Sequence, residues 1–302
     1  MFVVTGATSN TGNAVANSLL DRGAPVRVIG RSLERLQPLV TRGAEPVIAE
    51  PSDGAALARA FDGATAVYAM LQPGVDPASS DFPAYQRAVI DAITSALAGT
   101  RVRRAVALSG WGANYEKVSN PLEGLRVLEA RLRGIDRLRT LVLRPGWFME
   151  NALAFIRDIA RTGAALGQLR GDLALPMIAT ADIGAVAADA LVRGEFGEHG
   201  QRELEGPEPL SLDRAAAIVG ELTGRPDARY SRISAEEARS RLLSSGFSAH
   251  MADAVVQMTD DVNQGRIRMV QPREARIITP THFRSFAEAV LGKPAAAGGA
   301  AS

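Results

Sequence analysis

Residues 2–12 read FVVTGATSNTG, and this stretch decides the fold. The apolar run Phe2–Val4 has the composition of a short buried strand, and it stops at Gly6. Gly12–Arg22 then places its apolar residues at helical spacing. A glycine-rich turn that follows a strand and opens a helix is the setting in which such turns bind dinucleotides. The stretch therefore predicts the first strand, turn and helix of a nucleotide-binding βαβ unit.

Each part of this turn has a physical role. Gly6 is expected to make the tight turn, and Gly12 to allow close packing of the helix on the strand. The helix N-terminus offers unpaired N–H groups and a positive dipole end to a pyrophosphate. We expect three further donors beside them: Thr8, Asn10 and Thr11. Ser9 replaces the middle glycine of the usual pattern. Its Cβ narrows the space through which the backbone approaches the phosphates, although its hydroxyl can itself contact a phosphate. The alternative is a turn that links strand and helix without a ligand.

The rest of the first half repeats the same alternation of strands and helices. The further strands are expected at Val26–Ile29, Glu45–Ala49, Ala64–Leu71, Arg104–Leu108 and Leu138–Leu143. Strand–helix–strand repeats with right-handed crossovers give a parallel sheet with helices on both faces. The fold class predicted is therefore α/β, a doubly wound parallel sheet with a smaller C-terminal α+β lobe.

The second half is less regular. Trp147–Thr162, Asp182–Val192 and His282–Leu291 have helical patterns. We predict a nucleotide-binding domain over residues 1–146 and a smaller substrate-binding lobe over 147–292, which can interleave with the first sheet. Residues 293–302 are small and of low complexity, which predicts a disordered tail.

The residue after the second strand bears on the cofactor. An acidic residue in this place binds the adenosine ribose in NAD-binding folds, but here the strand ends in Gly30-Arg31-Ser32. A guanidinium suits a ribose 2′-phosphate through charge-assisted bonds. We therefore expect Arg31 and Ser32 to bind the cofactor and NADP(H) to be preferred over NAD(H). The alternative is that Arg31 is solvated and Ser32 only caps a helix; Asp53, after the third strand, is interpreted as a helix cap.

Composition excludes several classes of function. The chain has 302 residues, with 34 Lys+Arg and 33 Asp+Glu, so its net charge is +1. A net charge this close to zero does not indicate binding to nucleic acid or to an anionic membrane. The absence of cysteine excludes disulfides and thiolate chemistry, and the three histidines are too dispersed for a metal site. We find no signal peptide or membrane-length apolar run. The expectation is a cytoplasmic monomer or homodimer that acts on a small molecule.

Several further segments together carry a family resemblance. VALSG at 106–110, LRPGWFMEN at 143–151, ADIG at 181–184 and LEGPEPL at 204–210 follow TGATSNTG in one order. The chain resembles the NmrA-like branch of the atypical short-chain dehydrogenases/reductases. The resemblance implies NAD(P)H at the carboxyl ends of the strands, under a lobe that closes over the nicotinamide. The branch contains reductases of quinones and azo dyes, and also nucleotide-binding redox sensors without known chemistry.

The resemblance also implies roles for particular residues. Adenosine is expected to contact Ala69, Met70 and Leu71. The nicotinamide end is expected to contact Leu108, Ser109 and Pro145. The substrate pocket is expected to be lined by Trp111, Trp147, Phe148 and Asn151. Alternatives remain for the last three: Trp147 and Phe148 as a hydrophobic seam between the lobes, and Asn151 as a residue that orders a loop.

The family's usual proton donor is missing. Short-chain reductases carry Tyr-x-x-x-Lys on the helix after the fifth strand, but here Pro121 and Leu125 have that spacing. Ser109 and Tyr115 remain as candidate catalytic donors. We therefore expect hydride transfer from NADPH to a small, apolar, conjugated acceptor of quinone, azo, imine or enone type, which needs no protein acid in the hydride step. The alternative is an NADP(H)-binding redox sensor of the NmrA type with no catalysis.

Overall fold

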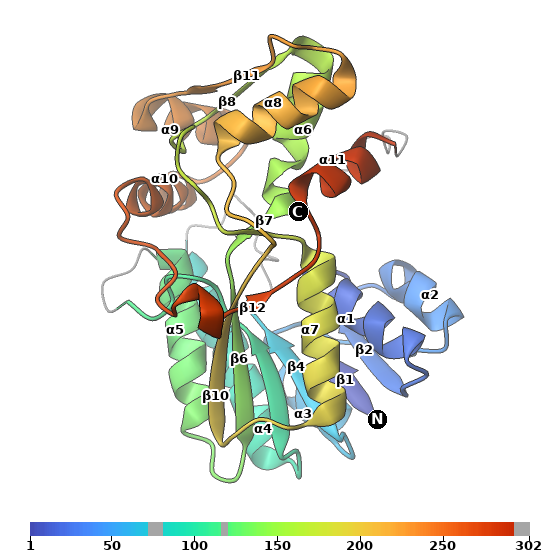
Figure 1. Ribbon diagram of the computed structural model, residues 1–302. Helices are drawn as coiled ribbons and strands as arrows, with labels where there is room; N and C mark the ends of the chain where they lie inside the picture. Colours follow the sequence, from blue (N-terminus) through green and yellow to red (C-terminus); the bar gives the residue numbers. More distant parts are fainter. Residues whose placement is uncertain (72–80, 116–119, 293–302) are drawn as a thin grey trace.

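The molecule is built on an eight-stranded parallel sheet in the order β12-β10-β6-β5-β4-β1-β2-β3 (Figure 1). The computed structural model describes residues 1–71, 81–115 and 120–292. The strands of this sheet are β1 (Phe2–Val4), β2 (Val26–Gly30), β3 (Glu45–Ile48), β4 (Ala66–Met70), β5 (Arg104–Leu108), β6 (Arg139–Pro145), β10 (His199–Glu205) and β12 (Ile277–Ile278). The strand order reverses between β1 and β4, which opens a crevice at their carboxyl ends. The glycine-rich turn after β1 lies at this switch point.

Helices cover both faces of the sheet, as the predicted fold class requires. The first face carries α1 (Asn10–Asp21), α2 (Leu33–Thr41) and α7 (Thr180–Arg193), whose apolar side chains join one core with Val4 and Tyr68. The opposite face carries α3 (Gly54–Phe61), α4 (Phe82–Gly99) and α5 (Asn120–Arg133). Alternate residues of β4 enter the two cores, because successive side chains of a strand point to opposite faces. The doubly wound α/β fold is confirmed.

A second group of elements lies beyond the carboxyl end of β6 (Figure 1). It consists of β7 (Trp147–Phe148), η1 (Met149–Ala152), α6 (Leu153–Thr162), β8 (Ala164–Gly167), β9 (Met177–Ile178), α8 (Leu212–Thr223), β11 (Arg229–Arg232), α9 (Ala235–Ser244), α10 (Ala249–Asn263), η2 (Arg273–Ala275) and α11 (Phe283–Leu291). We call these elements the upper lobe; all of them except α9 and η2 contribute to a third apolar core around Ile156, Ile159 and Val219.

The chain passes between the sheet and the upper lobe more than once. After β9, it returns to the sheet as α7 and β10, and after α10 it returns again as β12. Asp182 of α7 also accepts hydrogen bonds from the N–H (3.1 Å) and hydroxyl (2.8 Å) of Thr281, which precedes α11. Segments beyond residue 146 therefore belong to the sheet as well as to the upper lobe. The predicted division of the chain at residue 146 stays a prediction. The predicted tail at 293–302 lies outside the described residues.

The helix predicted over Trp147–Thr162 is wrong at its start. Gly146 passes so close to Pro176 that a Cβ would lie 2.0 Å from the Pro176 carbonyl oxygen. The Trp147 N–H donates to the same oxygen (2.9 Å), and β7 pairs with β9. This tertiary pairing holds Trp147 and Phe148 extended, so the regular helix begins only at Leu153.

Local helix signals are confirmed where polar residues precede helices. The side chains of Ser32 and Asp53 accept the N–H groups of Arg35 and Ala56 and cap α2 and α3. Within the described residues, no helix is both long and apolar enough to cross a membrane.

Candidate active site

The turn after β1 has the geometry predicted for its two glycines. Gly6 adopts φ +61°, a left-handed conformation that favours glycine. A Cβ on Gly12 would lie 2.2 Å from the carbonyl oxygen of Gly6, so only glycine lets α1 start this close to the strand. The packing role of Gly12 is therefore confirmed, whereas the contacts of both glycines to a phosphate stay predictions.

Two hydroxyls of the turn are occupied within it. The Ser9 hydroxyl donates to the Gly6 carbonyl (2.8 Å) and accepts the Gly12 N–H (3.2 Å) as the cap of α1. The Thr11 hydroxyl is buried and donates to the sulfur of Met70 (3.7 Å). Thr11 therefore offers a ligand its backbone rather than the side-chain donor predicted from sequence. A phosphate contact by the Ser9 hydroxyl stays a prediction.

Backbone donors remain free at the start of α1. The N–H groups of Asn10 and Thr11 have no acceptor among the described residues, as expected for the first turn of a helix. Thr8, Ser9 and Asn10 line a cavity of about 470 Å³ between this turn and the start of α7. A pyrophosphate fits these donors and the positive end of the helix dipole.

Glu150 borders the same cavity from η1. Its carboxylate accepts the N–H (3.0 Å) and the hydroxyl (2.6 Å) of Thr180 and so caps α7 from another element. The last residues of the LRPGWFMEN segment thus join the turn cavity to the upper lobe.

Charged residues lie near the end of β2, where the sequence predicted the adenosine end of a nucleotide. Arg31 is exposed. Burial raises the pKa of Tyr85 on α4; the Arg31 guanidinium opposes this rise and Glu50 adds to it, which places all three residues near one another. The Tyr85 hydroxyl is buried and has no hydrogen-bond partner among the described residues. Tyr85 was not predicted, because nothing local in the sequence marks it.

The residues expected to contact adenosine are mostly core residues. The side chains of Ala69 and Met70 are buried on opposite faces of the sheet. Leu71 is half-buried. Contacts of Ala69 and Met70 to a nucleotide would therefore have to come from the backbone, and the predicted role of all three stays a prediction.

A cavity of about 310 Å³, which we call the central cavity, lies beyond the ends of β5 and β6. It brings together six residues that the sequence predicted for the nicotinamide and substrate: Ser109, Trp111, Pro145, Trp147, Phe148 and Asn151. Leu122 and Leu125 of α5 and Met258 and Val262 of α10 also line it. Leu125, which has the spacing of the expected lysine, therefore lines this cavity. Leu108 is buried at the end of β5 and does not belong to this wall.

Ser109 is held by a buried ionic cluster that sequence reasoning missed. Its hydroxyl donates to Glu129 Oε1 (2.6 Å), and the same oxygen accepts from Arg144 Nε (2.8 Å). All three residues are about 5% exposed or less. The hydroxyl hydrogen is therefore directed at a carboxylate and not into the cavity, so that Ser109 faces a ligand as an acceptor.

Tyr115, the other donor candidate, does not line the central cavity. Its hydroxyl donates to the carbonyl of Arg268 (3.3 Å), in the segment after α10. Its predicted catalytic role stays a prediction.

The alternatives for the aromatic and amide residues can be compared with their contacts. Trp147 packs on the core of the upper lobe and Phe148 on the core of the sheet, so that both form a seam as well as a cavity wall. The Asn151 amide makes no hydrogen bond to the described residues, so it orders no loop by that means and is free to meet a ligand.

Comparison with known families and relatives gives a consistent picture. The model of an NAD(P)H-binding family matches residues 6–193. The chain is 30% identical over 273 residues to (4-alkanoyl-5-oxo-2,5-dihydrofuran-3-yl)methyl phosphate reductase of Streptomyces griseus, covering 90% of each chain. It is 28% identical to festuclavine dehydrogenase of Aspergillus fumigatus over 195 residues, which are 62% of this chain and 64% of that enzyme.

Two solved structures have a similar fold. The NADPH-dependent quinone oxidoreductase of Escherichia coli in complex with NADPH superposes with a TM-score of 0.77 at 24% identity, over 97% of this chain and all of that one. The triphenylmethane reductase of Citrobacter in complex with NADP(H) gives a TM-score of 0.79 at 18% identity, over 96% of this chain and all of that one.

Proposed function

Because the chain belongs to the NAD(P)H-binding, NmrA-like family of atypical short-chain dehydrogenases/reductases, we propose that it reduces small conjugated acceptors with NADPH. The assignment as an NAD(P)H-dependent reductase rests on the relatives. The acceptor class and the preference for NADPH are the parts proposed here. The observation that carries the proposal is the chemistry of the central cavity wall.

None of the described residues that line the central cavity has a titratable side chain. The Ser109 hydroxyl donates to Glu129, and the Thr259 hydroxyl donates to the carbonyl of Val255 (2.9 Å). Reduction of an isolated carbonyl calls for an acid beside the developing alkoxide. A conjugated acceptor spreads the charge over several atoms and takes its proton from water. An apolar wall that orients such an acceptor therefore suits the reaction.

The residues that would hold the cofactor follow from the same geometry. The free N–H groups of Asn10 and Thr11 bind the pyrophosphate, and Arg31 pairs with the 2′-phosphate. Ser109, fixed as an acceptor by Glu129, orients the nicotinamide end, and Pro145 and Trp147 exclude water beside it. When bound, NADPH supplies the hydride.

The acceptor of the Streptomyces relative supports an electron-poor alkene. The name of that substrate describes a ring double bond conjugated to two carbonyl groups. We extend this acceptor class, and not that particular molecule, to the present chain.

The test is turnover by the purified protein. NADPH absorbance is followed with a quinone, an unsaturated lactone, a cationic triphenylmethane dye, an iminium ion and a simple aldehyde. We expect oxidation of NADPH with at least one conjugated acceptor and none with the aldehyde. Turnover of the aldehyde alone would contradict the proposed acceptor class. Tight NADPH binding without any turnover would favour the redox-sensor alternative.

A further inference from the structure

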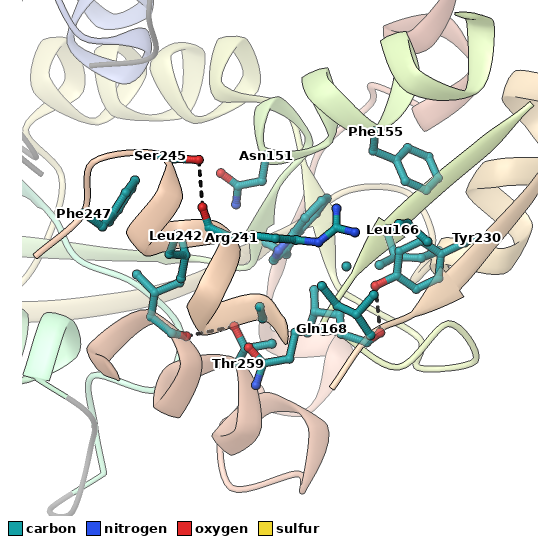
Figure 2. Close-up of a pocket in the computed structure, with 17 residues that line it drawn as sticks. Asn151, Phe155, Leu166, Gln168, Tyr230, Arg241, Leu242, Ser245, Phe247 and Thr259 are labelled. Carbon is teal, nitrogen blue, oxygen red and sulfur yellow. Dashed lines mark hydrogen bonds between the residues drawn. The ribbon is translucent and has the colours of Figure 1, made fainter. Parts of the chain in front are cut away.

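A second cavity, which we call the lobe cavity, adjoins the central cavity inside the upper lobe. It has a volume of about 380 Å³ and lies between β8, β11, α9 and α10 (Figure 2). Four residues line both cavities: Trp147, Asn151, Leu169 and Thr259. A ligand in the central cavity therefore has an adjoining space into which a substituent can extend.

Apart from the Asn151 amide, which it shares with the central cavity, the wall of the lobe cavity offers a ligand little besides apolar surface. Its hydroxyls are bonded to protein carbonyls: Tyr230 to Leu169 (2.8 Å) and Ser245 to Arg241 (2.9 Å). The Gln168 amide donates to the carbonyl of Val256 (3.0 Å). A ligand acceptor would have to displace these carbonyl partners, and buried polar groups left without a partner are costly.

Among the described residues of this wall, only Arg241 is charged, and it forms an exposed ion pair with Glu237. Arg241 extends among the other lining residues (Figure 2), and its Nη2 donates to Glu237 (2.8 Å). Its methylene stem can cover an apolar ligand while its head stays paired. Leu166, also in the wall, leaves 50% of its surface exposed, which is apolar area that a ligand can bury.

We propose that the lobe cavity binds an apolar substituent of the acceptor, so that the substrate is a conjugated head with an alkyl or aryl tail. The head occupies the central cavity and the tail passes Trp147 and Asn151. This inference rests on the proposed function for the identity of the head. The tail's contribution is hydrophobic, and a fully buried methylene corresponds to about a fourfold gain in binding.

The experiment uses 2-alkyl-1,4-naphthoquinones from methyl to hexyl with NADPH. We expect kcat/KM to rise about twofold to fourfold per added methylene. Leu242→Trp or Leu166→Trp fills the lobe cavity and should abolish this rise. Leu243→Trp is the matched control: Leu243 adjoins Leu242 on α9, is 38% exposed and does not line the cavity, so the rise should persist. Leu166 is half exposed, which lets this second variant fold if Leu242→Trp does not.

The outcomes separate this inference from the function on which it rests. Turnover that is independent of chain length overturns the tail site and leaves the reductase proposal intact. If no acceptor is reduced, the reductase proposal fails, and the tail site is then tested by binding octan-1-ol. The chain has two tryptophans, so in Trp111→Phe protein the emission comes from Trp147 alone. Leu166→Trp would add a second emitting tryptophan, so Leu166→Phe is the variant used in this binding test. A saturable change in Trp147 emission that Leu166→Phe weakens supports the tail site. Emission that shows no saturable change overturns it.

Discussion

Arg31 is the residue on which the choice between the two nicotinamide cofactors depends. It follows β2, at the place where NAD-binding folds carry an acidic residue that would repel a 2′-phosphate. The Arg31 side chain is exposed and lies near Tyr85. A hydrogen bond to a charged group contributes about 1.5–3 kcal/mol. We therefore expect Arg31→Asp to raise the Kd of NADPH about 10- to 100-fold and to leave that of NADH within about twofold. Calorimetric titration of both nucleotides measures this difference.

A matched variant separates a local contact from a change in net charge. Arg101→Asp alters the charge equally, but Arg101 is exposed before the amino end of β5, whereas Arg31 follows the carboxyl end of β2. It should leave the Kd of both nucleotides unchanged. Equal losses for NADPH and NADH in Arg31→Asp would rule out a contact of Arg31 with the 2′-phosphate.

At the scale of elements, Glu129 connects α5 to two strands. Its carboxylate accepts from Ser109 after β5 and from Arg144 on β6, and both charged side chains are 5% exposed. Removing one partner of such a pair leaves an uncompensated buried charge, whereas replacing both partners with apolar residues is often neutral. The Glu129–Arg144 pair therefore fixes the positions of α5 and Ser109 beside the central cavity. Its net contribution to the free energy of unfolding can be small even so.

This argument gives a prediction for stability. Glu129→Leu should lower the free energy of unfolding by about 3–5 kcal/mol, because Arg144 is left buried and unpaired. Adding Arg144→Met should restore it to within about 1–2 kcal/mol of the starting protein, the remainder being the Ser109 hydroxyl without its partner. Urea denaturation measures both. Glu123→Leu, on the exposed side of the same helix, is the control and should change little. A double variant no more stable than Glu129→Leu would contradict the pairing argument.

At the scale of the whole molecule, the sequence predicted what local patterns encode. The glycine turn, the alternation of strands and helices in the first half and the caps at Ser32 and Asp53 are set by neighbours within a few residues. The extended Trp147–Phe148 was not predictable in this way, since it depends on pairing with β9 some thirty residues later. The polar strand β10 likewise depends on its neighbour β6.

Some residues of the candidate site could likewise be predicted from the sequence, and others could not. Ser109 and Trp147 were predicted through the family resemblance, and both follow strands whose carboxyl ends meet at one edge of the sheet. Glu129 and Tyr85 lie within helices and reach the site across space. The lobe cavity arises only where α9 and α10 pack against β8 and β11, and no motif in those segments marks it.

Stability at alkaline pH also belongs to the whole molecule, because three buried or half-buried tyrosines act together. Burial raises the pKa of Tyr68 and Tyr85 above the usual value, and raises that of Tyr230 to about 12. The unfolded chain releases these protons near pH 10, whereas the folded protein keeps them. The chain has no cysteine and only two lysines, Lys117 and Lys293, so few other groups titrate there.

The sign of the effect follows from proton linkage. Below about pH 10 both states hold the phenolic protons, and the free energy of unfolding does not depend on these groups. Above it the unfolded state binds fewer protons, so stability falls by up to about 1.4 kcal/mol per pH unit for each group. The half-buried Tyr85 and Tyr230 contribute less, because solvent screens them. Urea denaturation at several pH values between about 9 and 11 should show this decline, and Tyr230→Phe should make it shallower. A free energy of unfolding that stayed level over this range would mean that these phenols ionise in the folded protein as readily as in the unfolded chain.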